Sequence, residues 1–200
     1  MMSVTRLRGR SALAGGAALL LLAGGAGCDS GDDIGSSGDG SPASSGKGAD
    51  VPAVETELTI DHGEGIDAAH QAKLLAGVQD VVDPWFDGAF LGDFPRSDYA
   101  AAFTAFTAGA AADAQRDLDI MSSSGIADRI DSATATNRRV RLDVFAPDGH
   151  PRGVTANFVL DFDTAGDLEE HLRVHGALYL AKDKGEWKVF GYDVDEAAEL

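Results

Sequence analysis

Two histidines, His171 and His175, have the spacing of a metal-binding pair. On a helix, residues four apart present both imidazoles on one face, where they can share a zinc ion. Residues 172–180 instead alternate between apolar and polar side chains, which is typical of a β-strand. In a strand, residues four apart lie about 13 Å from each other, too far to share a zinc ion at about 2 Å from each ligand. We therefore expect a solvated strand face here, with no metal and no other cofactor.

Three aspartates, Asp143, Asp161 and Asp163, could line one face of a sheet. Paired carboxylates perform acid–base chemistry, or bind calcium, when burial or mutual repulsion shifts their pKa values. The loop of alternating oxygen ligands with a glycine, which a calcium site requires, is missing around them. In so acidic a chain, we expect these side chains to be exposed strand carboxylates.

A basic cluster, Arg138, Arg139 and Arg141, precedes these carboxylates. We expect it to neutralise neighbouring carboxylates rather than to bind an external anion. Residues 63–65 lack the spacing of a phosphate-binding loop, and residues 122–125 lack the context of a nucleophile elbow. The motifs therefore assign no catalytic residue.

The sequence predicts one strand, then helices, and then a run of strands. Residues 54–60 alternate as a strand, and Asp67 can cap a helix that Pro84 stops or kinks. A connector leads to Pro95, and a second helical region runs from Tyr99 to Met121, with a break possible at Gly109. Short polar turns then join four strands, at 139–145, 154–162, 172–180 and 187–194. This order predicts an α+β fold, with N-terminal helices packed on a curved antiparallel sheet of four to five strands.

The closing hairpin, Gly176-Ala-Leu-Tyr-Leu-Ala-Lys-Asp-Lys-Gly-Glu-Trp187-Lys-Val-Phe-Gly-Tyr192-Asp-Val, carries a family resemblance. Its long strand, charged turn and tryptophan-containing last strand resemble the NTF2-like or cystatin-like superfamily, over roughly residues 66–195. The resemblance implies that the helices pack into the concave side of the sheet, around a cone-shaped pocket. The residues expected to line this pocket are Trp85, Phe103, Phe158, Tyr179 and Tyr192.

Several members of this superfamily are isomerases, cyclases or dehydratases that place an Asp or His and a Tyr in the pocket. Side chains of these types in this chain are Tyr99, Tyr179, Tyr192, Asp193 and His175. No local motif matches one of those enzymes, so the resemblance transfers no catalytic role. The alternative is that Tyr179 and Tyr192 complete the aromatic packing of the sheet.

The charge balance excludes one class of partner. The chain has 33 acidic and 16 basic residues, a net charge of −17. Three of the arginines precede residue 11, and without residues 1–28 the chain retains 13 basic and 33 acidic residues, a net charge of −20. Such a surface repels nucleic-acid phosphates, so we expect no nucleic-acid partner.

The first 28 residues have the pattern of a secretory signal. A basic stretch over 1–10 is followed by uncharged small and apolar residues over 12–27 and then by Cys28. The sequence Leu21-Leu-Ala-Gly-Gly-Ala-Gly-Cys28 resembles the lipobox of bacterial lipoproteins, although Gly25 stands where that family usually has an aliphatic residue. The resemblance implies that Cys28 becomes an acylated N-terminus, with palmitate-type chains that hold the protein on a membrane. A plain signal peptide with a chance cysteine is the alternative.

Residues 29–50 are mostly Gly, Ser and Asp, and cannot form a core. We expect a disordered linker with a reach of roughly 25 Å. Residues 51–200 then form a single α+β domain that folds without a disulfide, because Cys28 is the only cysteine.

Two hypotheses for the function follow. The first is an exported, lipid-anchored cell-envelope protein whose extracytoplasmic domain is not an enzyme and binds a protein or an apolar small molecule. If Phe103, Phe106, Phe158 and Trp187 filled the pocket, only a surface interaction would remain. The second is a small isomerase, cyclase or dehydratase, which requires an open cavity with a carboxylate or imidazole beside a tyrosine.

Overall fold

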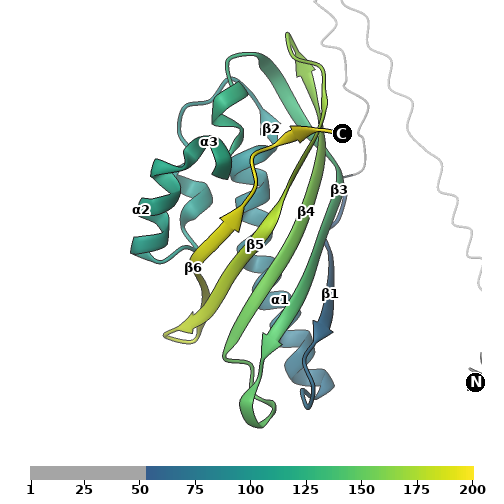
Figure 1. Cartoon of the computed structure of the whole chain (residues 1–200), viewed down its shortest axis with the longest axis vertical. Helices are drawn as coiled ribbons and strands as arrows, with labels where there is room; N and C mark the ends of the chain where they lie inside the picture. The colour runs from purple at the N-terminus through teal and green to yellow at the C-terminus, as the bar shows by residue number, and fades with distance from the viewer. Residues whose placement is uncertain (1–52) are drawn as a thin grey trace, which may run out of the picture. The chain divides into compact units, whose positions relative to one another are not determined.

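The computed structural model describes residues 53–200. The predicted signal segment 1–28, with Cys28, and the predicted linker 29–50 lie outside the described residues. In the described part, a first strand is followed by helical segments and then by a run of long strands (Figure 1).

One curved sheet contains all the strands, in the order β1-β3-β4-β5-β6 along its main path. Strands β3 to β6 run antiparallel to their neighbours, whereas β1 runs parallel to β3 at the sheet edge. Two-residue strands, β2 and β7, pair with β3 and β5. The fold is therefore α+β with a mostly antiparallel sheet, as predicted. The bounds are β1 Glu57–His62, β2 Gly92–Asp93, β3 Ile130–Phe145, β4 Gly153–Gly166, β5 His171–Asp183, β6 Glu186–Val194 and β7 Ala198–Glu199.

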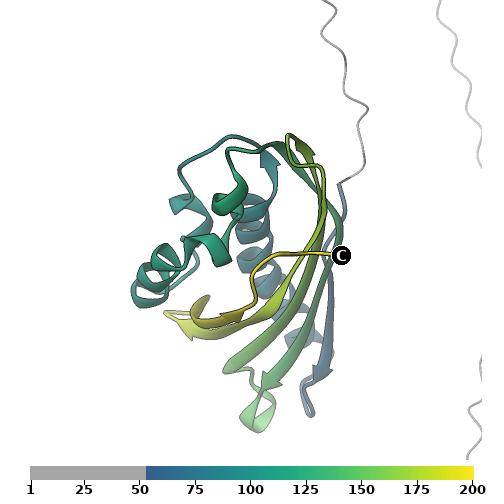
Figure 2. The same ribbon diagram turned by 45° about the horizontal axis from the view of Figure 1, so that its top comes forward.

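The helical segments between β1 and β3 lie on the concave side of the sheet (Figure 2). Asp67 caps the longest helix, because its carboxylate accepts a hydrogen bond of 2.9 Å from the backbone N–H of His70, as the sequence predicts. The α-helices are α1 Ala68–Trp85, α2 Ala108–Arg116 and α3 Leu118–Met121, and the tighter or wider turns are η1 Phe86–Phe90, η2 Ala100–Phe103 and η3 Ser123–Ile126.

Pro84 does not end the helical structure of this segment. Helix α1 includes Pro84 and ends one residue later, and the chain continues directly into the π-helical turn η1. The predicted connector from Trp85 to Phe94 is therefore helical in its first half. This continuation matters for packing, because it turns Trp85, Phe86 and Phe90 into the core, where each is at most 1 % exposed.

The second helical region is broken earlier than the sequence suggests. Gly109 lies inside α2, whereas the break falls between η2 and α2, around Phe106. There the chain makes a bridge to β6: Thr107 N–H donates to the Val189 carbonyl at 2.8 Å, and Val189 N–H donates to the Ala105 carbonyl at 3.0 Å. These bonds require extended backbone, so they interrupt a segment whose alanines favour a helix.

Strand β3 begins nine residues before the predicted Arg139. Residues 131–137 have small or polar side chains, so they lack the alternation of large apolar residues that marks a strand in sequence. This part of β3 is a strand because its backbone pairs with β4, from Ile130↔Gly166 onward.

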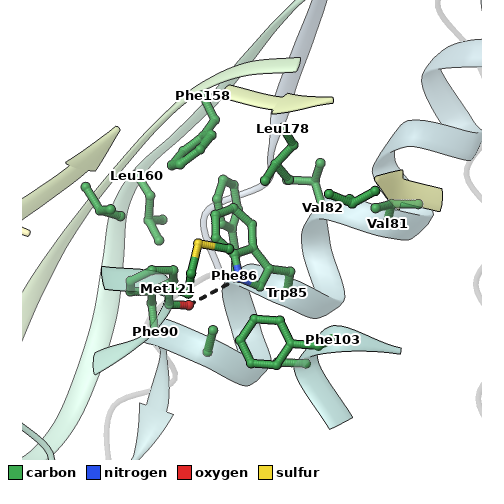
Figure 3. Close-up of a cluster of buried hydrophobic side chains, with 14 of the residues drawn as sticks. Val81, Val82, Trp85, Phe86, Phe90, Phe103, Met121, Phe158, Leu160 and Leu178 are labelled. Carbon is green, nitrogen blue, oxygen red and sulfur yellow. Dashed lines mark hydrogen bonds between the residues drawn. The ribbon is translucent and has the colours of Figure 1, made fainter. Parts of the chain in front are cut away.

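The core lies between the helices and the concave face of the sheet (Figure 3). Trp85 is fully buried, with its ring 5.1 Å from Phe158 of β4 and 5.4 Å from Phe90. Its indole Nε1 donates to the Met121 carbonyl at 3.3 Å, which satisfies the polar atom inside the core. Helix α1 and the sheet are thus joined by packed aromatic rings.

Candidate functional site

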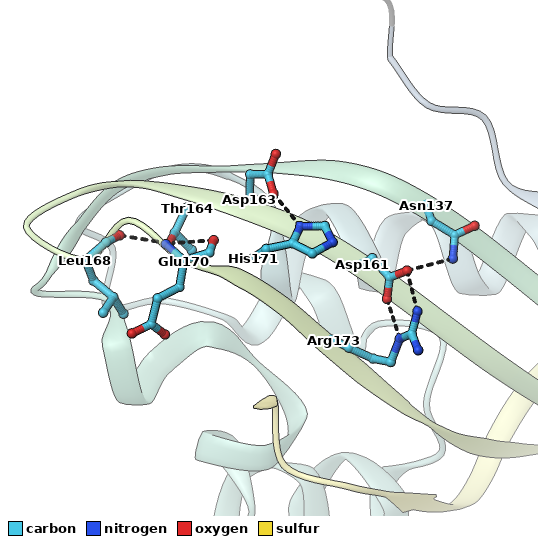
Figure 4. Close-up of polar contacts among 8 residues, drawn as sticks. All are labelled: Asn137, Asp161, Asp163, Thr164, Leu168, Glu170, His171 and Arg173. Carbon is cyan, nitrogen blue, oxygen red and sulfur yellow. Dashed lines mark hydrogen bonds and ion pairs between the residues drawn. The ribbon is translucent and has the colours of Figure 1, made fainter. Parts of the chain in front are cut away.

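His171 and His175 both lie on strand β5, so the strand interpretation of this pair is confirmed. Each imidazole has its own carboxylate: His171 contacts Asp163 (Figure 4), and His175 Nδ1 lies 2.9 Å from Asp195. Among residues 53–200, no three His, Cys, Asp or Glu side chains are placed to hold a metal ion. The two histidines therefore form separate contacts, each with its own carboxylate, on the outer face of the sheet.

Asp161 corrects the expectation that all three strand aspartates are exposed. It is only 6 % exposed and accepts two hydrogen bonds from Arg173, at 2.6 and 2.8 Å, and one from Asn137 at 3.0 Å (Figure 4). Hydrogen bonds from Arg173, which outweigh the effect of burial, lower the pKa of Asp161. This carboxylate is a charged, fully paired part of the sheet rather than a free acid or base.

The other two aspartates are half-exposed or exposed, as predicted. Asp163 lies beside His171, and Asp143 accepts from Asn157 at 2.9 Å and lies 2.5 Å from His62. On the β3–β4 ladder, Asp143 is opposite Thr155, which is six residues from Asp161 along β4. The three carboxylates therefore do not form one cluster, and each has its own partners.

The arginine cluster neutralises carboxylates, as predicted, at two of its three positions. Arg138 is 10 % exposed and lies 3.2 Å from Asp83 and 3.0 Å from Asp87, which ties β3 to the end of α1. Arg141 lies 3.5 Å from Asp61 of β1.

The five residues expected to line a cone-shaped pocket lie in three places. Trp85, Phe103 and Phe158 are at most 4 % exposed and belong to the core. Tyr179 has its ring 6.3 Å from that of Phe190, which is exposed. Tyr192 donates a hydrogen bond of 2.7 Å to Asp117, at the junction of α2 and α3.

The side chains proposed for an enzyme do not gather in one cavity. Burial, followed by the adjacent Asp117, raises the pKa of Tyr192 far above its ordinary value, so the phenol keeps its proton. Burial also raises the pKa of Tyr99, whose hydroxyl donates to the Arg96 carbonyl at 3.4 Å. Asp193 is exposed, and His175 is on the outer sheet face.

A surface hollow lined by three lysines and a tryptophan lies between helix α1 and the β5–β6 hairpin. It has a volume of about 500 Å³, within the range of about 300–1,000 Å³ that small-molecule sites occupy. We call it the lysine pocket. Its ionisable residues are Lys73 and Asp80 of α1 and Lys182, Glu186 and Lys188 of the hairpin, and its apolar surface comes from Trp187, Val81, Ala105 and Gly77.

The close approach of Gly77 to Trp187 shapes this pocket. A Cβ atom at Gly77 would lie 2.6 Å from Cδ1 and 3.1 Å from Nε1 of Trp187, so a side chain there would displace the indole. Glycine inside a helix costs about 1 kcal/mol relative to alanine. The contact with Trp187 gives the physical reason for a glycine in the middle of α1.

All lysines of the described part lie at this end of the molecule. Lys73, Lys182 and Lys188 line the pocket, and Lys184 occupies the adjoining turn. Lys188 Nζ lies 3.5 Å from Glu186, and Lys182 Nζ lies 5.2 Å from the centre of the Trp187 ring. Within residues 53–200, Lys73 and Lys182 have no ion pair, which leaves two ammonium groups available to a ligand.

Trp187 also leaves a hydrogen-bond donor available. Within residues 53–200, the buried side-chain N and O atoms that lack a hydrogen-bond partner are Arg96 Nε and Arg138 Nε. The Nε1 atom of Trp187 is not among them and makes no hydrogen bond to the described residues, so it reaches solvent. Trp187 itself is 8 % exposed.

Sequence reasoning missed the lysine pocket because its residues are far apart along the chain and match no motif. The available signal was compositional: residues 53–200 have four lysines, of which three fall within positions 182–188. Only the packing of α1 against the hairpin adds Lys73 and Gly77 to this group.

Comparisons with known proteins identify no relative. No protein-family model matches the chain, and neither the curated proteins nor the solved structures include a significant match. Within residues 53–200, none of the helices has the length and hydropathy needed to cross a membrane.

Proposed function

We propose that this chain is a lipid-anchored envelope protein whose extracytoplasmic domain is a binding module and not an enzyme. The signal-like residues 1–28 and the lipobox-like sequence that ends at Cys28 support export and acylation. Helices on the concave side of a mostly antiparallel sheet support an NTF2-like or cystatin-like architecture. The linker 29–50 then holds the domain away from the bilayer.

The proposal that the domain is not an enzyme is supported by the packed aromatic side chains between the helices and the sheet. Enzymes with the architecture that the chain resembles need a polar-lined cavity between the helices and the sheet. Here that space holds Trp85, Phe86 and Phe158, with ring centres 5.1–5.7 Å apart. Such packing leaves the surface as the place for a partner, and the lysine pocket is the surface hollow best suited to one.

An isomerase, cyclase or dehydratase is less well supported. Its best candidate pair is Tyr192 and Asp117, which share a hydrogen bond of 2.7 Å. The raised pKa of Tyr192 keeps this phenol protonated, and neither residue lines the lysine pocket. The pair is accounted for as a link between β6 and the α2–α3 junction.

Replacement of the proposed acylation site tests the anchor. Cys28→Ala and Ser30→Ala, a control two residues away, are expressed in a bacterial host supplied with an alkyne analogue of palmitate. We expect the wild type and Ser30→Ala to incorporate the label and sediment with membranes, and Cys28→Ala to do neither. If Cys28→Ala remained as labelled and as membrane-bound as the wild type, acylation of Cys28 would be refuted.

A further inference from the structure

We propose that the lysine pocket binds a small organic anion with one negative charge and a flat apolar body, an aromatic carboxylate being the simplest example. The inference deepens the proposed binding function and rests on it. Three observations carry it: the charges around the pocket, the indole surface inside it, and the glycine that keeps the pocket in shape.

The charges set the sign and the size of the ligand charge. Three ammonium groups and two carboxylates line the pocket, which leaves a net charge of +1. Glu186 lies against Lys188, so Lys73 and Lys182 are the cations that can attract a ligand. This local excess occurs in a domain with 12 basic and 28 acidic residues over 53–200. A carboxylate balances such a pocket, whereas a dianion would be repelled by Asp80 and by the surrounding acidic surface.

The wall of the pocket sets the shape of the ligand body. The indole of Trp187, together with Val81 and Ala105, provides apolar surface for a ring, and its free Nε1–H can donate to a carboxylate oxygen. A ligand with both a ring and a carboxylate would therefore contact apolar surface and cations at once. Small-molecule sites commonly combine apolar walls with a few placed polar groups.

Three backbone features hold the lysines and the indole in this arrangement: the hairpin register, the hairpin turn and a glycine in α1. In the hairpin register, Lys182 is opposite Trp187, so backbone pairing places its side chain on the same sheet face as the indole, with Nζ 5.2 Å from the ring centre. Gly185, which lines the pocket, has a φ of 95° and closes the turn between the strands. Gly77 lets α1 approach the edge of the indole that carries Cδ1 and Nε1.

A second hollow provides a contrast within the same molecule. It has a volume of about 370 Å³, and its ionisable residues are all acidic: Asp119, Glu170, Glu196 and Glu199. An anion that binds through charge must avoid it. An acidic cluster alone does not define a ligand, so we assign none to this second hollow.

Two indole N–H signals make the test direct, because the chain has two tryptophans in different surroundings. Trp187 lines the pocket, whereas Trp85 is fully buried and bonded to Met121. The purified mature chain, labelled with ¹⁵N and kept in detergent, is titrated with phenylacetate, with its uncharged isostere phenylacetamide and with acetate. We expect phenylacetate to shift the Trp187 signal and leave that of Trp85 in place, with binding at least about tenfold tighter than for the other two probes.

Matched lysine variants locate the binding site. Lys182→Gln removes a pocket cation, whereas Lys184→Gln removes a lysine on the same hairpin that does not line the pocket. We expect Lys182→Gln to weaken phenylacetate binding about fivefold, the factor that a surface ion pair of about 1 kcal/mol provides. We expect Lys184→Gln to have little effect, and added salt to weaken binding to the wild type.

Several outcomes would overturn the proposal. They are a Trp187 signal that phenylacetate does not move, equal binding of phenylacetate and phenylacetamide, and equal losses in the two lysine variants. The anchor is tested separately, since label on Cys28 does not depend on the pocket. A protein that is acylated but does not bind phenylacetate would refute the pocket alone, and the reverse result would refute the anchor alone.

Discussion

Gly77 sets how closely helix α1 approaches Trp187 of the hairpin. For Gly77→Ala, the gain in helix propensity is about 1 kcal/mol, whereas overpacking against a buried indole costs about 1–3 kcal/mol. Because the Cβ atom would lie 2.6 Å from Trp187 Cδ1, we expect the cost to win, with a net destabilisation of about 1 kcal/mol. Urea denaturation gives the change in the free energy of unfolding.

Gly109→Ala is the matched control for this prediction. Gly109 is also helical, in α2, but a Cβ atom there would have no neighbour within 4 Å. This variant should be neutral or more stable than the wild type by up to about 1 kcal/mol. Equal effects of the two substitutions would show that contact with Trp187 does not govern position 77.

Asp161 gives a second prediction at the scale of single residues, on pH dependence. Its pKa in the folded protein lies below the ordinary value of 3.8, because Arg173 and Asn137 hydrogen-bond to the charged form. The stabilisation is therefore present above the unfolded pKa and is lost as the pH falls through the folded one. We expect Asp161→Asn to destabilise the protein by about 1–2 kcal/mol at pH 7, and this difference to begin to shrink below about pH 4 and to disappear as the pH falls through the lowered pKa of the folded state.

The neighbouring Asp163→Asn is the control for Asp161. The Asp163 side chain is 59 % exposed, so solvent screens its pairing with His171 and the effect should stay within about 0.5 kcal/mol at either pH. A difference between Asp161→Asn and the wild type that persisted unchanged at pH 3 would contradict the charged Asp161–Arg173 pair.

At the scale of secondary-structure elements, aromatic rings join helix α1 to strand β4. Phe158 is 3 % exposed and contacts both Trp85 and Phe86. We expect Phe158→Ala to lower the free energy of unfolding by about 3–5 kcal/mol, because it removes a buried ring and leaves a cavity. Thermal or urea unfolding monitored by circular dichroism measures the loss.

Phe190 provides the comparison on the other face of the sheet. It is 57 % exposed, so Phe190→Ala should change stability by no more than about 0.5 kcal/mol. A loss as large as that of Phe158→Ala would mean that the outer face of the sheet is covered in solution.

The elements themselves show how far sequence patterns reach. Local periodicity predicted β1, α1 and the strands of the meander, because these have large apolar residues at regular spacing. It failed at Phe106, where a backbone bridge to Val189, 83 residues away, interrupts the helix. It also missed the first half of β3, where small side chains show no hydrophobic alternation and the strand forms through backbone pairing with β4. The lysine pocket was missed for a related reason, since Lys73 and Lys188 meet only through packing.

At the scale of the whole molecule, the proposed binding module is strongly acidic, and its lysines are concentrated at one end. We expect so acidic a surface to repel nucleic acid and anionic headgroups, so the proposed attachment to a membrane would depend on acyl chains rather than on charge. Two buried acyl chains are enough for lasting attachment, at about 0.8 kcal/mol per methylene.

Gly25 offers a prediction for the whole chain. It occupies the lipobox-like position at which bacterial lipoproteins usually have an aliphatic residue, so we expect Gly25→Leu to increase the fraction of chains that are processed and acylated. A pulse-chase experiment with the palmitate analogue measures this fraction. Unchanged or slower processing would argue that the segment is not read as a lipobox.

The mass of the N-terminal peptide of the chain purified from membranes tests the central claim most directly. Lipid anchoring predicts that this peptide begins at Cys28 and carries the mass of its acyl chains. A peptide that begins at another residue, or at Cys28 without acyl chains, would contradict it.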